Sequence, residues 1–398
     1  MDTRKLQGLN DEIPELLFAI MRYELFSAPL NKNVFFNLSE NTLERLYALA
    51  DQHDLAHWVG DALYQHGCLP KELAITKKYQ QAQIVSLYRC ANLSLERKKI
   101  TAVLEDAQIP YVPLKGMLIV DYYPKSNLRT SSDTDILIHE EDLPRALQCL
   151  SDKLKYTQHE AYPHFHDISL FSPGGFHLEL HFTLACGHEF LDATLEKVWA
   201  HCAPVKDGSF EYRQSPEYFI FHQIAHMASH FLKGGCGIRP LADLQLLMKK
   251  MTYDEAILEA LCREARLLTF YTHIKALSEV WFCGRAHDDV TRQMQSYIIW
   301  GGVYGTMDNN LAVKTQKKNK IGYIISRIFM PYQLLKTRYP VLKKYKWLYP
   351  IMTVRRWFGL LSPTTRHRAT TELKKTSSLS GEKISKVAEL LDVLELNE

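Results

Sequence analysis

The sequence has no regular arrangement of cysteines. Its eight cysteines are scattered along 398 residues, and no two of them form a CxxC motif. Small disulfide-stapled domains and structural zinc sites both need cysteines at short, paired spacings. The pattern therefore favours free thiols in a reducing compartment and disfavours both of these classes.

The chain also has no long apolar run. A membrane-spanning helix needs about 18 consecutive apolar residues, and no such stretch occurs. The segment 1–17 carries acids and has no continuous apolar core, unlike a secretory signal peptide. We therefore expect a cytoplasmic protein of bacterial type.

Acidic residues are nearly absent from 314–375. This segment has 16 lysines and arginines against one acid, Glu372, so its local charge is +15, whereas the whole chain carries +3. Aromatic residues alternate with the basic ones. Such a pattern suits an anionic membrane, where the protein would be peripheral at the inner face. It also suits nucleic acid, or a solvated face on a packed helical domain.

Apolar residues make up 46% of the chain, which can supply the cores of two or three structural units. Before residue 109 they recur at spacings of three and four, which predicts helices over 15–26, 41–66 and 71–108. In the last of these helices, the apolar stripe is expected to consist of Ile84, Leu87, Ala91, Leu95 and Ile100.

The pattern changes to short strands after Pro110. Apolar runs separated by turn residues predict a mixture of strands and helices. We expect strands over 111–114 and 135–139, helices over 117–123 and 141–154, and a hairpin formed by 167–171 and 176–184. The expected fold class is α+β, with a small mixed-sheet core flanked by helical regions.

Carboxylates follow the alternation of two of these strands. Asp133 and Asp135 are separated by one residue, so both lie on the same face of a strand. Glu179 and His181 alternate in the same way on a later strand. A hard cation such as Mg²⁺, or Mn²⁺ in its place, binds carboxylate and phosphate oxygens. Three acids on neighbouring strands therefore predict a phosphoryl-transfer site.

A turn at Lys115 and Gly116 connects the first strand to a helix. Glycine there lets the backbone approach a phosphate, and the start of the helix offers unpaired N–H groups. The histidines at 164–166 and 177–181 suggest a second kind of metal site, for zinc. No cysteine accompanies them, so zinc is the weaker interpretation. His181 is instead expected to orient Glu179 or to contact the substrate.

A helix predicted over 216–233 carries His222, His226 and His230 at four-residue spacing, on one face. These histidines would contact the nucleotide, pack as satisfied core residues, or bind a metal through two of their number.

Two cations lie at the break that follows this helix. Lys233 and Arg239 could reach a phosphate, and Asp243 is expected to hold Arg239 because the two are four residues apart. Surface ion pairing is the alternative.

The order of these motifs resembles the nucleotidyltransferase core of the DNA polymerase beta superfamily. More narrowly, it is similar to a poorly characterised bacterial nucleotidyltransferase family over 40–285. The superfamily's usual turn is Gly-Gly or Gly-Ser, whereas Met117 follows Gly116 here. The motifs that carry the resemblance are Leu114-Lys115-Gly116, Arg129, Asp133-Thr-Asp135, Glu179-Leu-His181, His226-x-x-x-His230 and Arg239-Pro-Leu-Ala-Asp243.

The resemblance implies transfer of an NMP group from a nucleoside triphosphate to a hydroxyl-bearing acceptor, with Mg²⁺ or Mn²⁺. Asp133, Asp135 and Glu179 would be catalytic and would bind the metal. The nucleotide would be bound by Lys115, Gly116, Arg129, Ser132, His181, His230, Lys233 and Arg239.

Four parts are expected along the chain. They are a helical region at 1–108, a nucleotidyltransferase α/β core at 109–200, a helical domain at 201–305 and a basic aromatic-rich tail at 306–398. Two other functions stay open. One is a catalytically inactive nucleotide-binding or scaffold module linked to cell-surface polysaccharide synthesis, and the other is an RNA-modifying transferase whose tail grips nucleic acid.

Overall fold

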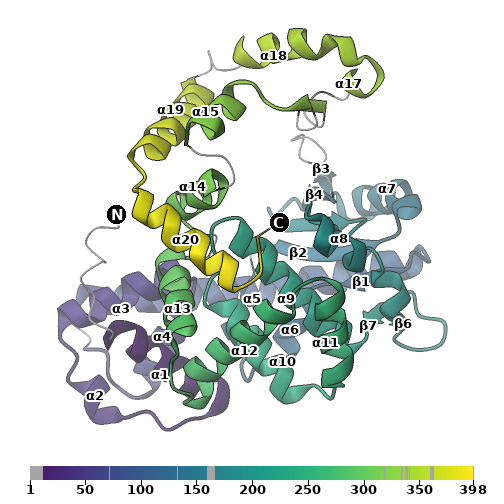
Figure 1. Cartoon of the computed structure of the whole chain (residues 1–398). Coiled ribbons are helices and arrows are strands. Elements are labelled where there is room, and N and C mark those ends of the chain that lie inside the picture. Colours follow the sequence, from purple (N-terminus) through teal and green to yellow (C-terminus); the bar gives the residue numbers. More distant parts are fainter. Residues whose placement is uncertain are drawn as a thin grey trace.

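The computed structural model describes residues 12–70, 72–131, 133–158, 166–303, 305–316, 320–332, 335–336, 339, 341–358 and 363–397. Over these ranges the chain is mostly helical, with a mixed five-stranded sheet and a separate two-stranded sheet. The predicted α+β class is therefore confirmed. Figure 1 shows helices around the sheet and an arm of helices projecting from the body.

Four helices precede a single long one. The predicted helix 41–66 is divided in two because the chain turns at Asp54, which adopts a positive φ of 55°. The Ser39 side chain begins the first of the two halves by accepting from the Thr42 N–H at 3.1 Å. The helices are α1 Glu12–Phe26, α2 Lys32–Phe36, α3 Glu40–Gln52, α4 Ala56–Gln65 and α5 Ala74–Asp106.

The long helix α5 continues for 33 residues without a break. Its expected apolar stripe is wrong in the middle, since Ile84, Leu87 and Leu95 are 61%, 57% and 52% exposed. Two different partners explain this. Helix α4 packs against the first half of α5, and the sheet with α7 (Leu143–Leu154) packs against the second half. Side chains between the two contacts face solvent.

The main sheet has the strand order β1-β2-β5-β4-β3. Strand β2 is parallel to β5, and the other neighbours are antiparallel. The predicted hairpin is present as β4 and β5, closed by the Ser172 N–H donating to the Phe176 carbonyl. The strands are β1 Tyr111–Pro113, β2 Asp133–Ile138, β3 Thr157–Gln158, β4 Asp167–Phe171 and β5 His177–His181.

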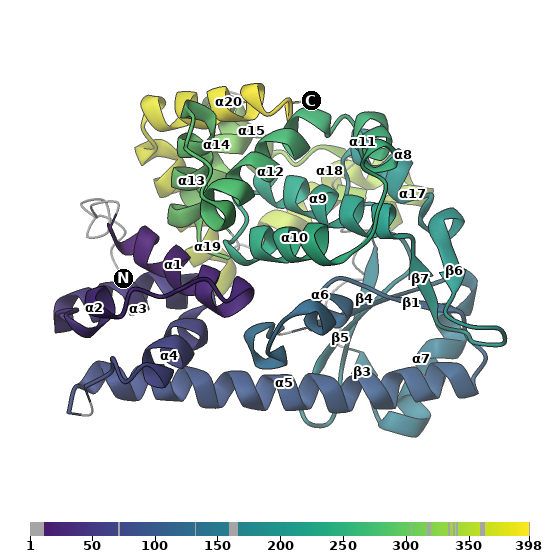
Figure 2. The same ribbon diagram turned by 90° about the horizontal axis from the view of Figure 1, so that it is seen from below.

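One face of this sheet is apolar and the other is polar. Ile136 and Ile138 on β2, together with the leucines of β5, pack against α5 and α7 in one buried cluster. The alternate residues point to the opposite face. Helices α9 (Pro216–Leu232) and α10 (Arg239–Lys250) lie over that face, and Figure 2 shows the sheet between the two helical layers.

A second buried cluster joins the N-terminal helices to α9, α10 and the helices that follow, so these parts share one core. Short elements connect the strands to this core: α6 Gly116–Ile119, η2 Val120–Tyr122, η3 Ser126–Leu128, η4 Glu140–Asp142, α8 Glu189–Leu195, η5 Val198–His201, β6 Cys202–Pro204 and β7 Tyr212–Gln214. The remaining helices of the body are α11 Glu255–Glu264, α12 Leu268–Cys283 and α13 Asp289–Gly301.

The C-terminal part leaves the body and returns to it. Residues 320–378, here called the arm, lie between α14, on which they are mounted, and α20, which packs against α13 and α14. No helix among the described residues is long and apolar enough to cross a membrane. The elements are α14 Met307–Gln316, α15 Lys320–Ile328, α17 Val341–Lys344, η6 Lys346–Leu348, α18 Tyr349–Phe358, α19 Pro363–Ser378 and α20 Gly381–Val393.

Two glycines allow the loop after α9 to touch the loop before α14. A Cβ atom on Gly305 would lie 2.4 Å from the carbonyl carbon of Gly234, and both glycines have positive φ angles, 75° and 117°. Next to them, the Asn310 side-chain amide donates to the Lys233 carbonyl at 2.5 Å. Main chain therefore packs directly on main chain at this point.

Candidate functional site

The register of β2 and β5 brings the predicted acids together. Asp135 lies opposite Glu179, and Asp133 lies opposite His177. Because side chains alternate along each strand, Asp133, Asp135 and Glu179 all point to the polar face. The parallel pairing that the sequence could only imply is therefore present.

The ligand atoms of these side chains form two overlapping groups. Asp135, Glu179 and His181 have oxygen or nitrogen atoms within 4.8 Å of one another, and so do Asp133, His177 and Glu179. Glu179 belongs to both groups. The His181 Nε2 atom lies 3.0 Å from Asp135 and 3.6 Å from Glu179, so this imidazole contacts both acids. We expected His181 to orient Glu179, and its imidazole lies closer to Asp135 than to that acid.

Lys115 supplies a cation next to these acids. Its Nζ atom lies 3.3 Å from Asp135 Oδ1. The backbone of Lys115 has φ 42° and ψ −121°, a conformation that L-residues rarely adopt. Such strain persists only where the surroundings hold it, and it is common at functional sites. The turn thus directs the Lys115 ammonium group toward the carboxylates.

Charges fix the ionisation of this group. Burial alone would raise the pKa of the Asp135 carboxyl, but the Lys115 ammonium and the His181 imidazole outweigh it, and the pKa lies well below its usual range. Burial would lower the pKa of Lys115, yet Asp135, Glu179 and Asp133 raise it overall. The pKa of His181 is also raised, because hydrogen bonds to Asp135 and Glu179 exceed the effect of burial. Asp135 is therefore ionised across the physiological range.

Arg129 is held by a buried carboxylate. Its Nε donates to the two carboxylate oxygens of Asp243 at 2.9 and 3.1 Å, and the Tyr123 hydroxyl donates to the same group at 2.6 Å. The guanidinium packs on Gly116, where a Cβ atom would lie 3.2 Å from Nη1. Gly116 therefore makes room for Arg129, a role in addition to the one that we predicted for it.

Arg239 has a different partner from the expected one. Its Nη1 donates to Asp54 Oδ2 at 3.1 Å and to the Thr130 carbonyl at 3.0 Å. The expectation that Asp243 holds Arg239 is wrong, because Asp243 is engaged with Arg129 instead. Asp54 is remote in sequence, so spacing along one helix could not reveal it.

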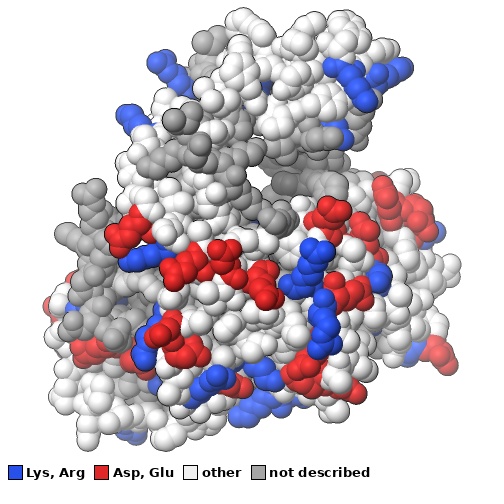
Figure 3. All heavy atoms as spheres, viewed as in Figure 1, with Lys and Arg blue, Asp and Glu red and all other residues white. Residues whose placement is uncertain are grey.

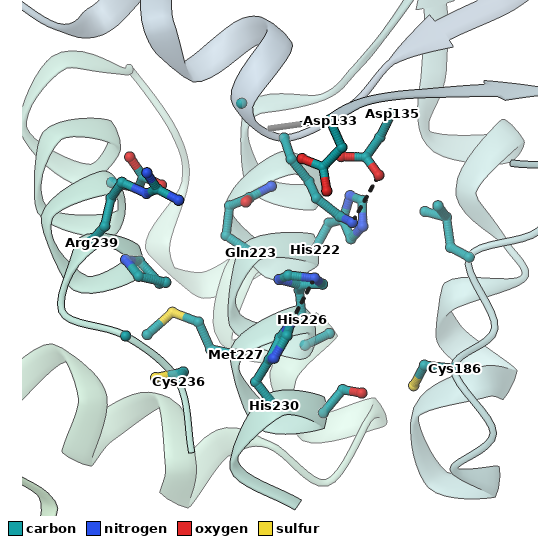
Figure 4. A pocket seen from close by; sticks show the side chains of 18 of the residues that line it. Asp133, Asp135, Cys186, His222, Gln223, His226, Met227, His230, Cys236 and Arg239 are labelled. Atoms are coloured by element: carbon teal, nitrogen blue, oxygen red, sulfur yellow. Dashed lines mark hydrogen bonds and ion pairs between the residues drawn. The ribbon is translucent and has the colours of Figure 1, made fainter. Parts of the chain in front are cut away.

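The histidine row of α9 forms one wall of the site. His226 and His230 place their Nε2 atoms 3.2 Å apart, and Figure 4 shows them below Asp133 and Asp135, with Arg239 and Cys186 on opposite sides. Burial lowers the pKa of His222 to about 3, that of His230 to about 4, and that of His226 well below its usual value. The row is therefore neutral at physiological pH.

The three acids, Lys115, the two arginines and the three histidines of α9 surround one cavity of about 340 Å³. Ser132 lies outside the described residues, and the other ten predicted site residues line the cavity: Lys115, Gly116, Arg129, Asp133, Asp135, Glu179, His181, His230, Lys233 and Arg239. Within the described part of the chain, a third group that could hold a metal comprises His166, Asp167 and His181. His164, which we considered as a zinc ligand, is outside the described residues.

Comparison with known proteins adds the reaction class. Residues 39–283 match the sequence model of a family described as an uncharacterised nucleotidyltransferase. The chain belongs to this nucleotidyltransferase family. No curated protein and no solved structure matches the chain.

The matched residues of this nucleotidyltransferase contain the whole set of acids and cations that line the cavity. A nucleotidyltransferase family implies a nucleoside triphosphate as substrate, and the acidic groups have the chemistry to hold a divalent metal. The basic arm lies beyond residue 283, outside the match.

Two residues that support the site, Ser131 and Asp54, were not predicted, and His177 was considered only as a possible zinc ligand. Ser131 donates to Asp133 at 2.9 Å, His177 lies 3.9 Å from Glu179, and Asp54 holds Arg239. A signal existed for His177, since it alternates with Glu179 on the same strand. The other two are set by turns and tertiary contacts and leave no periodic pattern in the sequence.

Proposed function

We propose that the chain is a metal-dependent nucleotidyltransferase that moves an NMP group from a nucleoside triphosphate to a hydroxyl-bearing acceptor. The observation that carries this is the register of β2 and β5, which gathers Asp133, Asp135 and Glu179 on one face of a cavity. The order of strand, turn, short helix, Asp-x-Asp strand and neighbouring acid supports membership of the DNA polymerase beta superfamily.

The residues present fit Mg²⁺ or Mn²⁺. Three carboxylates converge there, and the Lys115 ammonium already lies against Asp135, so the face attracts positive charge. Carboxylate oxygens are the ligands that such cations prefer. Asp133, Asp135 and Glu179 would hold the metal, which neutralises phosphate charge and lowers the pKa of an attacking hydroxyl.

The cations that line the cavity would bind the triphosphate. Lys115 lies beside the acids, Lys233 follows α9, and both line the cavity. Arg129 and Arg239 are each fixed by a carboxylate yet line the same cavity, so their charges are positioned before any ligand enters. Preorganised cations of this kind stabilise charge that develops on phosphate oxygens.

The neutral histidine row would contact the nucleoside rather than its phosphates. His222, His226 and His230 carry no charge at physiological pH, so they offer ring faces and single hydrogen bonds. Glu179, which is less buried than Asp135, would take the proton of the acceptor hydroxyl.

Replacing the acids tests this proposal. Incubation of the protein with each labelled NTP, Mg²⁺ or Mn²⁺ and a cell extract shows what becomes labelled. We expect the double variant Asp133→Asn, Asp135→Asn to lose transfer by at least about 100-fold, since metal-bound phosphate charge would no longer be balanced. The matched control Asp152→Asn removes an exposed carboxylate of α7 and should label as the wild type does.

Wild-type labelling by the double variant would refute the assignment. Metal-dependent nucleotide binding without transfer to any acceptor would favour the inactive binding module. Label in RNA would identify the acceptor as RNA, and label in a protein or glycan would exclude the RNA-modifying alternative.

A further inference from the structure

An apolar stripe is exposed along η6 and α18. Trp347, Ile351, Val354 and Phe358 are 70%, 53%, 44% and 66% exposed. They follow one another at spacings of four, three and four residues, so they share one face of a helix. We call these four residues the α18 stripe. Exposed apolar residues in such a row are costly in water and mark a contact surface.

The opposite side of α18 is fixed to the rest of the arm. The Trp357 Nε1–H and an Arg356 N–H both donate to the Ile328 carbonyl, at 2.9 and 3.1 Å, and the Tyr349 hydroxyl donates to the Met330 carbonyl at 2.8 Å. These bonds orient α18 so that the stripe faces away from α15. Figure 1 places α18 at the end of the arm that is farthest from the body.

Basic side chains accompany the stripe. Lys344, Lys346 and Arg355 are exposed on the same short stretch, within a segment of charge +15 that contains a single acid. The face shown in Figure 3 has Lys and Arg but no Asp or Glu on the upper part of the arm, whereas the body carries both signs. Its charge therefore suits an anionic partner.

We propose that the α18 stripe inserts into the interfacial layer of an anionic lipid membrane, with Lys344, Lys346 and Arg355 on the lipid headgroups. Ile351 and Val354 stand at the centre of the stripe, and aliphatic side chains cannot stack on bases as a single-stranded nucleic-acid site requires. A basic helix with one apolar face lies in the plane of the membrane surface. The arm would then attach the body, which contains the cavity, to that surface.

Vesicle co-sedimentation of the full chain tests the proposal. Wild-type protein should sediment with phosphatidylcholine vesicles that contain about one-third phosphatidylserine, and not with phosphatidylcholine alone, because the charge attraction is needed. The variant Trp347→Ser, Phe358→Ser should bind the anionic vesicles at least about tenfold more weakly, since it loses two apolar anchors.

A matched control separates this surface from general stickiness. Ile84 and Leu87 on α5 are 61% and 57% exposed, so Ile84→Ser, Leu87→Ser removes a similar exposed apolar pair far from the arm. We expect that control to sediment as the wild type does. All four altered residues are exposed, so we expect folding to be preserved, and circular dichroism of the variants checks this.

A charge-reversal pair tests the electrostatic part. Lys344→Glu, Lys346→Glu should weaken binding by about 25-fold or more, since each basic side chain near the surface contributes about a fivefold factor. The control Lys77→Glu, Lys98→Glu reverses two exposed charges on α5 and should change binding little.

Three outcomes would overturn the proposal. The first is that the wild type does not sediment with anionic vesicles, and the second is that the α5 control loses as much binding as the stripe variant. The third is that the wild type binds a labelled single-stranded RNA that competes with the vesicles, and that the stripe variant binds this RNA equally well. The last outcome would make the arm a nucleic-acid surface.

Discussion

At the scale of single residues, the turn at Lys115 and Gly116 determines how the site is built. Gly116 has no Cβ, and the Arg129 guanidinium occupies the space where one would be. Lys115, with a positive φ of 42°, takes up the conformation that a glycine would adopt without strain. The turn therefore accepts backbone strain at Lys115 and places its ammonium group beside Asp135.

Replacing Gly116 by alanine should destabilise the protein. The new Cβ would lie 3.2 to 3.4 Å from atoms of Arg129, whose position is fixed by Asp243. Overpacking of a buried contact costs about 1 to 3 kcal/mol, and the helix preference of alanine over glycine returns at most about 1 kcal/mol. We expect a net loss of about 1 kcal/mol in the free energy of unfolding, measured by urea denaturation.

Gly381 provides the control for this change. It is also the first residue of a helix, α20, but a Cβ there meets nothing within 4 Å. Gly381→Ala should leave the stability unchanged or raise it slightly. If both alanine variants unfolded at the same urea concentration, the contact between Gly116 and Arg129 would not matter.

The sequence predicted the acids themselves but not their supports. Asp133, Asp135 and Glu179 could be predicted because alternation along a strand is a local rule. The partner of Arg239 could not be predicted, because the packing of the helices brings Asp54 to it and no local spacing encodes that packing. A charge four residues away on the same helix was the nearest candidate, and it was the wrong one.

At the scale of elements, two ion pairs fasten α10 to other parts of the chain, one to the segment that leads into β2 and one to the turn between α3 and α4. The pair between Arg129 and Asp243 is buried, with side chains 9% and 6% exposed, and joins α10 to that segment. The pair between Arg239 and Asp54 is more accessible, with side chains 17% and 38% exposed. The two pairs should therefore differ in their importance for stability.

Removing one partner of each pair tests this difference. Asp243→Asn leaves the buried Arg129 charge without compensation, which costs about 3 to 5 kcal/mol. Asp54→Asn breaks two pairs that water reaches, with Arg239 and with Arg89, and about 0 to 1 kcal/mol is expected for each. Chemical denaturation of both variants measures the difference, and equal losses would contradict the assignment of Asp243 as the structural carboxylate.

Periodicity was reliable for elements that have one partner and failed for α5. The hairpin of β4 and β5 was predicted because each strand has one buried face. Helix α5 changes partner along its length, from α4 to the sheet and α7, so no single stripe describes its burial. The predicted helix 41–66 is divided at Asp54 for a comparable reason. The chain turns there because of tertiary contacts, and no proline or glycine marks the turn in the sequence.

At the scale of the whole molecule, buried neutral histidines couple stability to pH. Burial lowers the pKa of His53 and of His57 to about 4. His53 accepts from the Ile238 N–H through Nδ1 and bonds the Ile299 carbonyl through Nε2, so its ring is satisfied only when neutral. Between the pKa of these rings in the folded chain and their higher pKa in the unfolded chain, unfolding is therefore accompanied by their protonation.

Stability should therefore fall as the pH is lowered from 7 to 5. The unfolded chain binds protons near pH 6.5 while the folded rings stay neutral down to about pH 4, so acid favours unfolding in that window. Each histidine contributes up to about 2 kcal/mol over this change. Urea denaturation at both pH values should show that His53→Gln reduces the pH dependence, whereas the exposed His367→Gln retains it. If the stability of His53→Gln changed with pH as much as that of the wild type, His53 would not be a source of the pH dependence.

The division into four parts stays a prediction. The structure shows one buried cluster that includes side chains from α1, α4, α9, α12 and α20, so the N-terminal and central helices are packed together. The pattern along the chain separates them because the strands of the sheet interrupt the helical periodicity. Packing between segments that are distant in sequence was beyond what a linear pattern can reveal.

The contact between Gly234 and Gly305 has a mechanical consequence. Side chains between two packed segments can change rotamer and absorb a displacement, but main chain against main chain offers no such compliance. Helix α14, which supports the arm, is thus stiffly connected to Lys233 at the cavity wall. A force applied to the arm when it meets its partner would reach the cavity as a rigid displacement instead of being dissipated on the way.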